Sequence, residues 1–265
     1  MKKDSHLRPI VMTIAGLDPS AGAGILADAR TISAFGCYPV AVVTAITFQN
    51  AAGVSGVLAQ DPGSVRGQLL PIFNGLTVSA IKTGMMPTRE VVREVAQVLR
   101  EHPTPSLVID PVMQSTSGYK FMDDDTVAEL RGNLLPLATV VTPNVPEAER
   151  LVGFSIQDEA TMRRAAEAIR RSGVKAVLIK GGHLDSGTEV IDVLDSHGDM
   201  SVFRSERVHN GEFRGTGCAL ASGIASCLAQ GHSLEESVRR AREFVREAMQ
   251  DGVTMGGKGI LFKLQ

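Results

Sequence analysis

A cysteine follows a glycine-rich turn in the last quarter of the chain, in the sequence Arg214-Gly215-Thr216-Gly217-Cys218. The apolar run that begins at this cysteine predicts a buried helix. Amide groups at the beginning of a helix carry partial positive charge, so the two glycines could expose an anion hole for a transferring phosphoryl group. The same position favours a thiolate, and we expect the pKa of Cys218 to be depressed. The alternative is an inert, buried thiol above an alanine-rich core helix.

A second glycine-rich segment follows the first apolar run of the chain and reads AGLDPSAGAG from residue 15 to residue 24. Its three glycines and small neighbours would let a ligand approach the backbone closely, and the helix after it would offer its N-terminus. The segment matches neither the Walker pattern nor the dinucleotide fingerprint, so neither standard nucleotide motif applies. A plain turn between a strand and a helix is the alternative interpretation.

Oxygen-bearing side chains stand where two further strands are expected to end. Asp110 follows one apolar run, and Asn144 and Glu147 follow another. Carboxylate and carbonyl oxygens suit Mg²⁺, and ligands of open α/β sheets bind at the carboxyl ends of the strands. Lys180 follows a third run and could reach phosphates, whereas His183 is interpreted as a loop residue. Each position could instead be an ordinary polar strand exit.

The elements that must position these residues alternate along the chain. Apolar, β-rich runs separated by amphipathic helical patterns are typical of a parallel sheet covered by helices on both faces. The predicted strands are residues 10–16, 40–47, 79–83, 106–110, 139–142 and 175–180. The predicted helices are residues 89–101, 158–172, 218–229 and 233–250, and an antiparallel hairpin at the sheet edge is predicted for residues 189–204. No linker interrupts this pattern, so one domain over residues 1–265 is the simplest interpretation.

The composition argues against several classes of protein. The net charge is -2 and the pI is about 6.3, so no global field favours nucleic acid or an anionic membrane. No apolar run is long and uninterrupted enough for a membrane span, and the first residues lack the apolar block of a signal peptide. The cysteines Cys37, Cys218 and Cys227 have no paired spacing, which argues against a disulfide framework or a zinc site. We expect a cytoplasmic protein with small-molecule partners.

The motifs, in this order, resemble those of the hydroxymethylpyrimidine/phosphomethylpyrimidine kinases, a family of the ribokinase-like superfamily. The resemblance covers roughly residues 10–252 and is carried by AGLDPSAGAGILAD (15–28), TAITFQNAAGV (44–54), KTGMM (82–86), DPVM with STSG (110–118), TPNVPEAE (142–149), KGGH (180–183) and GTGC (215–218). It implies a ribokinase-like three-layer α/β/α fold with a mostly parallel sheet. It also implies ATP-dependent phosphorylation, with Mg²⁺, of 4-amino-5-hydroxymethyl-2-methylpyrimidine and then of its monophosphate. Pairing of sheet edges into a homodimer is common in the family, and the 189–204 hairpin is a candidate edge.

The resemblance implies a role for each matching residue. Positions that line the pyrimidine pocket of the family are matched by Gly16, Asp28, Gln49, Met85 and Val112. Metal positions are matched by Asp110 and Glu147, and nucleotide positions by Asn144, Lys180, Gly182 and Arg214. The anion hole is matched by Gly215, Thr216 and Gly217, and Cys218 matches the residue proposed as catalytic base.

Three positions depart from the family pattern. Leu17 stands where a small hydroxyl residue is usual, and residues 256–261 lack the closing Gly-Pro-x-x-His pattern. Arg214 replaces the usual His before Gly-Thr-Gly-Cys, and its fixed charge could contact phosphate directly.

Two rival functions stay open at this point. The first is a pyridoxal or pyridoxine kinase. Related pyridoxal kinases tend to carry Met where this chain has Gln49, so Gln49 favours the aminopyrimidine. The second is a sensor that binds the pyrimidine without catalysis. The Gly-Thr-Gly-Cys turn and the strand-end acids argue against a sensor, because a pure binder has no use for a metal-phosphate end.

Overall fold

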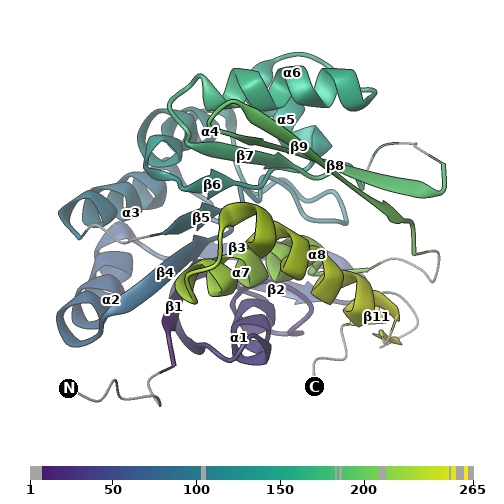
Figure 1. Ribbon diagram of the computed structural model, residues 1–265. Helices are drawn as coiled ribbons and strands as arrows, with labels where there is room; N and C mark the ends of the chain where they lie inside the picture. The colour runs from purple at the N-terminus through teal and green to yellow at the C-terminus, as the bar shows by residue number, and fades with distance from the viewer. Residues whose placement is uncertain are drawn as a thin grey trace, which may run out of the picture.

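The computed structural model describes residues 8–102, 106–182, 184, 187–208, 213–250, 252–254 and 260–261. Within these residues nine strands form one sheet in the order β3-β2-β1-β4-β5-β6-β7-β8-β9 (Figure 1). The strands are β1 (Ile10–Leu17), β2 (Tyr38–Asn50), β3 (Gly53–Ala59), β4 (Val78–Thr83), β5 (Leu107–Ile109), β6 (Val140–Val141), β7 (Ala176–Ile179), β8 (Glu189–Ser196) and β9 (Asp199–Glu206). From β2 to β7 neighbouring strands run parallel, whereas β3, β8 and β9 pair antiparallel at the two ends. Two short strands, β10 (Val253–Thr254) and β11 (Ile260–Leu261), pair with each other.

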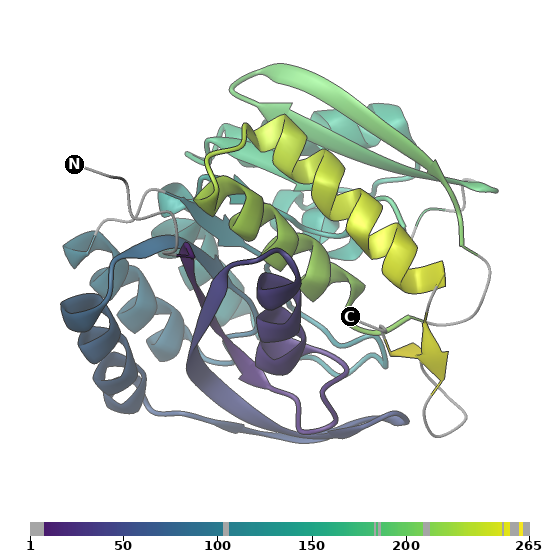
Figure 2. The same cartoon turned by 60° about the horizontal axis from the view of Figure 1, so that its bottom comes forward.

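Helices cover both faces of the sheet (Figures 1 and 2). They are α1 (Gly24–Ala34), α2 (Pro62–Gly75), α3 (Arg89–Glu101), α4 (Asp124–Glu129), α5 (Val145–Val152), α6 (Glu159–Arg170), α7 (Thr216–Ala229) and α8 (Leu234–Gln250), with a π-helical turn (Leu130–Leu134) and a 3₁₀ turn (Leu135–Leu137) after α4. The ribokinase-like three-layer α/β/α fold is thereby confirmed. No helix among the described residues has both the length and the apolar character needed to cross a membrane.

Alternating side chains along each strand build two cores. On β1, Met12 packs into the core beneath α2 to α6, whereas the adjacent Val11 packs into the core beneath α1, α7 and α8. The same alternation places Ile81 of β4 in the first core and Ala80 in the second. Successive side chains of a strand point to opposite faces, and helices cover both faces of this sheet. Apolar residues are therefore needed on both faces, which explains the unbroken apolar runs in the sequence.

The predicted strands are all present, and helix α3 has the predicted bounds. The hairpin predicted for residues 189–204 is also confirmed, as β8 and β9 joined at His197 and Gly198, both with positive φ. Strand β3 was not predicted, although it extends the sheet beyond β2. The single domain proposed for the whole chain stays a prediction.

Candidate active site

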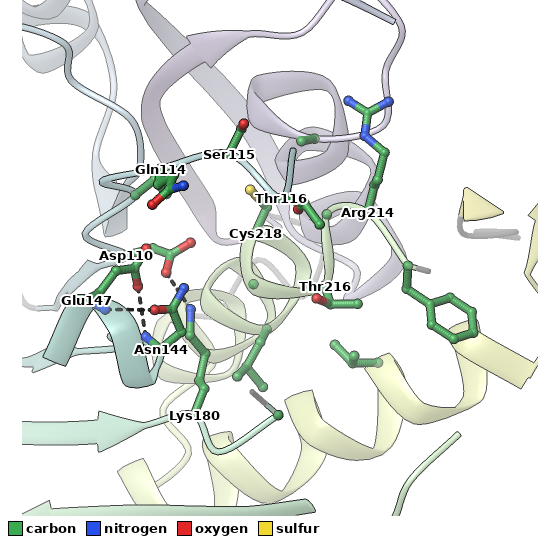
Figure 3. A pocket seen from close by; sticks show the side chains of 18 of the residues that line it. Asp110, Gln114, Ser115, Thr116, Asn144, Glu147, Lys180, Arg214, Thr216 and Cys218 are labelled. Atoms are coloured by element: carbon green, nitrogen blue, oxygen red, sulfur yellow. Dashed lines mark hydrogen bonds and ion pairs between the residues drawn. The ribbon is translucent and has the colours of Figure 1, made fainter. Parts of the chain in front are cut away.

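A cavity of about 1330 Å³ lies at the carboxyl ends of the parallel strands and is walled by α7 and α8. All of the predicted site residues except Asp28 line it. They come from the ends of six strands or the loops that follow them, and from the beginning of α7, so segments about 200 residues apart in the sequence meet in one space. Figure 3 shows Cys218 and Thr216 on one side, facing Asp110, Asn144, Glu147 and Lys180.

The turn before α7 is held in a conformation that only glycine adopts easily. Gly215 has φ +77, and a Cβ placed on it would lie 2.3 Å from the carbonyl oxygen of Gly22. No side chain caps the N-terminus of α7, and none caps α1, which also begins at the cavity. By contrast, Asp61 and Thr88 cap α2 and α3, and α4, α5 and α6 are likewise capped. The beginnings of α1 and α7 therefore keep first-turn amides available to an anion, whereas α5, which also begins at the cavity, is capped by Asn144.

Cys218 differs from the expectation for a helix N-terminus. Burial raises the pKa of its thiol from 9.0 to about 11, even though the Lys82 ammonium and the Gly24 amide act in the opposite direction. The carboxylates of Asp28 and Asp110 add to the increase. The prediction of a depressed pKa is therefore wrong, because desolvation and two nearby negative charges outweigh the helix terminus.

Asp28 lies beneath the cavity and does not line it. Its carboxylate is fully buried and accepts hydrogen bonds from Thr13 Oγ1 at 2.6 Å, Lys82 Nζ at 2.8 Å and Ser222 Oγ at 2.9 Å. The expected contact with the pyrimidine is thus corrected: the oxygens of Asp28 are occupied by protein donors. Its partner Lys82 is also fully buried but does line the cavity. Burial alone would lower the pKa of Lys82, yet the neighbouring Asp28 carboxylate raises it, so the ammonium stays charged.

The acidic group at the strand ends consists of the carboxylates of Asp110 and Glu147 together with the ammonium of Lys180. Lys180 Nζ donates to Asp110 Oδ1 at 2.8 Å, and Glu147 closes a capping box with Asn144 at the beginning of α5. Burial raises the pKa of Glu147 to about 7, the Asp110 carboxylate acts in the same direction, and Lys180 opposes both. A Cβ on Gly217 would lie 3.1 Å from Lys180 Nζ, so this lysine lies beside the anion-hole turn.

These residues fit a Mg²⁺ ion that is shared with phosphates. The described residues contain no group of three or more His, Cys, Asp or Glu side chains arranged to hold a metal by themselves. Mg²⁺ is usually bound through one or two carboxylates, several waters and substrate phosphates, so the residues that would hold it here are Asp110 and Glu147. The pKa of Glu147 is about 7, so near neutral pH part of this buried carboxyl is protonated, and a divalent cation would deprotonate it.

Arg214 does not reach the acidic group. It lines the cavity, but its guanidinium donates to Asp18 Oδ2 at 3.0 Å and to the carbonyl oxygen of Asn50 at 2.9 Å. Its donors contact two loops of the protein, and a direct contact with phosphate stays a prediction.

The opposite end of the cavity contains residues that the motifs did not identify. Arg239, Arg242 and Arg246 of α8 line it together with Arg204 and Arg207. Arg239, Arg242 and Arg246 are spaced by three and four residues, which places them on one face of α8. This spacing was the signal in the sequence that could have identified them. Arg242 is fixed by an ion pair with Asp192 at 2.7 Å. This end is the more basic part of the cavity.

A loop over residues 114–120 borders the cavity near Gln49. Ser117 of this loop accepts a hydrogen bond from the Val54 amide at 3.4 Å, so the loop meets the turn between β2 and β3. His183 and residues 255–259 lie outside the described residues, so the expectations for them are not tested.

The open sheet, the uncapped start of α7 and the lysine-carboxylate group at the strand ends define a small-molecule kinase of the ribokinase-like superfamily. Residues 18–261 match the sequence model of the phosphomethylpyrimidine kinases. The chain belongs to the phosphomethylpyrimidine kinase family.

Known proteins agree with this assignment. The thiamine biosynthesis bifunctional protein of Geobacter sulfurreducens is 42% identical over 249 residues, which are 94% of this chain and 51% of that protein. The hydroxymethylpyrimidine/phosphomethylpyrimidine kinase of Streptomyces coelicolor is 40% identical over 94% of this chain and 91% of its own length. The pyridoxal kinase of Bacillus subtilis, solved as an ADP complex, superposes with a TM-score of 0.89 at 32% identity and covers 97% of both chains.

Proposed function

We propose that the protein transfers the γ-phosphoryl group of Mg²⁺-ATP to the hydroxymethyl group of 4-amino-5-hydroxymethyl-2-methylpyrimidine, and then phosphorylates the monophosphate to the pyrophosphate. The name of the Streptomyces relative, which this chain matches over nearly its whole length, supports both steps. One observation carries the proposal: a single cavity joins the uncapped start of α7, the Asp110–Lys180 pair and the pocket around Gln49.

The pyrimidine would occupy the end of the cavity formed by β1, β2 and β4. Gly16 leaves room there, because a Cβ on it would lie 2.4 Å from Met85 Cε. Met85 and Val112 supply apolar surface for the ring, and Gln49 supplies a carboxamide for the polar ring edge. Thr47 Oγ1 lies 3.1 Å from Gln49 Oε1 and thereby orients that carboxamide.

Phosphoryl transfer would take place between this pocket and the basic end of the cavity. A bond forms between the alcohol oxygen and the γ-phosphorus while the bond from that phosphorus to the β-phosphate oxygen breaks, and ADP leaves. Such transition states are loose, so positioning and neutralisation of charge dominate catalysis. The amides of Gly215 to Gly217 and the Lys180 ammonium would stabilise the equatorial oxygens. Mg²⁺ held by Asp110 and Glu147 would neutralise phosphate charge.

Cys218 would accept the proton of the alcohol. Only the thiolate form can accept this proton, and because proton loss comes late in a loose transition state, the thiolate is needed only at that stage. Lys82 and the Gly24 amide favour the thiolate form and so support this role.

Release of ADP with Mg²⁺-ATP and the pyrimidine alcohol, with products resolved by mass, tests the proposal. Cys218→Ala should lose most turnover and keep pyrimidine binding. The matched control is Cys227→Ala, because Cys227 is buried and does not line the cavity, so this variant should leave turnover unchanged. A wild-type protein that binds the pyrimidine without releasing ADP would support a sensor instead.

A pyridoxal kinase is the second candidate, favoured by the close superposition on the Bacillus subtilis enzyme. Parallel assays on pyridoxine and on the pyrimidine alcohol separate the two, and a higher kcat/KM for pyridoxine would reverse our assignment.

A cytoplasmic homodimer also remains a proposal. The free cysteines support a reducing compartment. The sheet ends in β9 on one side and in β3 on the other, and either edge could pair with a second copy. Light scattering after size-exclusion chromatography would give the mass in solution.

A further inference from the structure

Arg214 connects three segments that are far apart in the sequence. Its guanidinium donates to Asp18 Oδ2 at 3.0 Å, to Ser20 Oγ at 3.4 Å and, across 164 residues, to the carbonyl oxygen of Asn50 at 2.9 Å. The Arg214 side chain is 11% exposed and that of Asp18 is 2% exposed. In Figure 3 the guanidinium points away from Asp110, Glu147 and Lys180.

Asp18 organises the loop that Arg214 contacts. Oδ1 of Asp18 accepts hydrogen bonds from the amide and the hydroxyl of Ser20, at 2.8 and 2.7 Å. Oδ2 accepts from the amide of Ala23, the residue before α1, at 3.0 Å, and shares this oxygen with Arg214. The ion pair therefore fixes the whole loop between β1 and α1.

Each connected segment is adjacent to a part of the site with its own task. Arg214 precedes Gly215, whose turn packs against the carbonyl oxygen of Gly22 without room for a side chain. Asn50 follows Gln49, which faces the acceptor end of the cavity. One guanidinium thus connects the segment that leads into the anion-hole turn with the segment that follows Gln49.

We propose that Arg214 is a positioning residue for phosphoryl transfer, which holds the anion-hole turn in register with the acceptor pocket through Asp18 and Asn50. The inference rests on the proposed function for its kinetic readout. Arginine suits this task because its planar fork presents several donors in fixed directions, whereas lysine offers a point charge and histidine two donors at most. A misplacement of about 1 Å at a reacting centre lowers rates about a hundredfold.

Arg214→Met should therefore lower kcat about a hundredfold while KM for the pyrimidine alcohol changes by less than about threefold. Arg214→Lys should give an intermediate kcat, since it can keep the pair with Asp18 but not all three contacts. Asp18→Asn should resemble Arg214→Met, and the double variant should be no slower than the slower single variant, because both remove the same connection.

Arg170→Met is the matched control. Arg170 pairs with the buried carboxylate of Asp195 at 2.8 Å, as Arg214 pairs with Asp18, but neither residue lines the cavity. The control should lower stability in urea and leave kcat unchanged.

Hydrogen exchange gives a readout that needs no substrate: Arg214→Met, unlike Arg170→Met, should speed exchange both in residues 215–219 and in residues 50–54.

The two readouts separate the possible failures. Wild-type protein without turnover on the pyrimidine alcohol refutes the proposed function, while the exchange measurement still tests Arg214. Positioning by Arg214 is refuted if kcat of Arg214→Met is no lower than that of Arg170→Met, or if KM for the pyrimidine alcohol rises as much as kcat falls. Additive effects in the double variant, or unchanged exchange at residues 50–54, would refute it as well.

Discussion

Cys218 should react with an alkylating reagent much more slowly than an ordinary cysteine, although it begins a helix and lines a cavity. Its pKa of about 11 lies two pH units above the usual 9.0. Only the thiolate reacts, and each pH unit is a tenfold change in its fraction, so alkylation near pH 8 should be about a hundredfold slower. The rate should rise about tenfold per pH unit until the pH approaches the pKa.

Lys82→Met should slow the reaction further. Among the groups around Cys218, the Lys82 ammonium lowers the thiol pKa most, and its removal also leaves the Asp28 carboxylate unpaired beneath the cavity. Lys175→Met removes an exposed lysine outside the cavity and should leave the rate unchanged. Reaction with iodoacetamide, followed by mass mapping of each cysteine, measures these rates, and the urea-unfolded chain supplies the reference rate for an exposed thiol.

The same experiment contains its own test for unfolding. Cys37 and Cys227 are buried, so their labelling reports loss of the fold in any variant. If Cys218 in the folded protein reacts as fast as in urea at the same pH, burial does not control this thiol and our reasoning is wrong. If Lys82→Met accelerates labelling of Cys218 while Cys37 and Cys227 stay protected, the assignment of charges is wrong.

Three further predictions concern the turn, the pocket and the acidic group. Gly215→Ala should abolish most turnover and lower the free energy of unfolding in urea, because its Cβ would meet the Gly22 carbonyl oxygen at 2.3 Å. Gly36→Ala is the control, because Gly36 has a similar φ of +76 but no atom within 4 Å of an added Cβ, so this variant should lose only the backbone strain of about 1–3 kcal/mol. An equal loss of unfolding free energy in both variants would contradict the clash at Gly215. Gln49→Met should move the ratio of kcat/KM values from the pyrimidine alcohol towards pyridoxine, and an unchanged ratio would exclude Gln49 as the selective residue. Because the pKa of Glu147 is raised from 4.5 to about 7 in the fold, the metal-free protein should lose about 3 kcal/mol of stability through this carboxyl as the pH rises between these values. Glu147→Gln should remove this part of the pH dependence in urea titrations without Mg²⁺, and parallel curves for the two proteins would refute the raised pKa.

The fold was largely predictable because its strands are buried on both faces. Apolar runs such as residues 10–16 and 175–180 are typical of strands that are buried on both faces, in the middle of a sheet covered by helices. Strand β3 escaped prediction because Gly53 and Gly56 interrupt it and it lies at the edge. Its pairing depends on a neighbour: a Cβ on Gly56 would lie 2.6 Å from Phe48 Cδ2 of β2, so the aromatic ring covers the glycine. A single strand read alone does not contain this cross-strand contact.

The motifs predicted most of the residues that meet at the cavity, whereas the electrostatics of these residues were not predictable. Motifs identify which residues approach the cavity, because strand ends and helix beginnings fix their positions. The partner of a carboxylate is a tertiary property: Asp28 pairs with Lys82 across 54 residues, and this pairing removes Asp28 from the cavity wall. The raised pKa of Cys218 has the same origin, since the helix terminus is visible in the sequence and the depth of burial is not.

The two cores of the sheet imply an order of events on the ribosome. Residues of the acceptor pocket lie mostly within the first 112 positions, whereas α7 and α8, which cover Val11, Ala80 and Val108, are synthesised afterwards. Until residues 216–250 leave the exit tunnel, the apolar face beneath them lacks its cover, and a nascent chain in that state is a substrate for chaperones. Ribosome-bound fragments that end before residue 216 should therefore associate with a chaperone that binds nascent chains, and those that extend past α8 should release it.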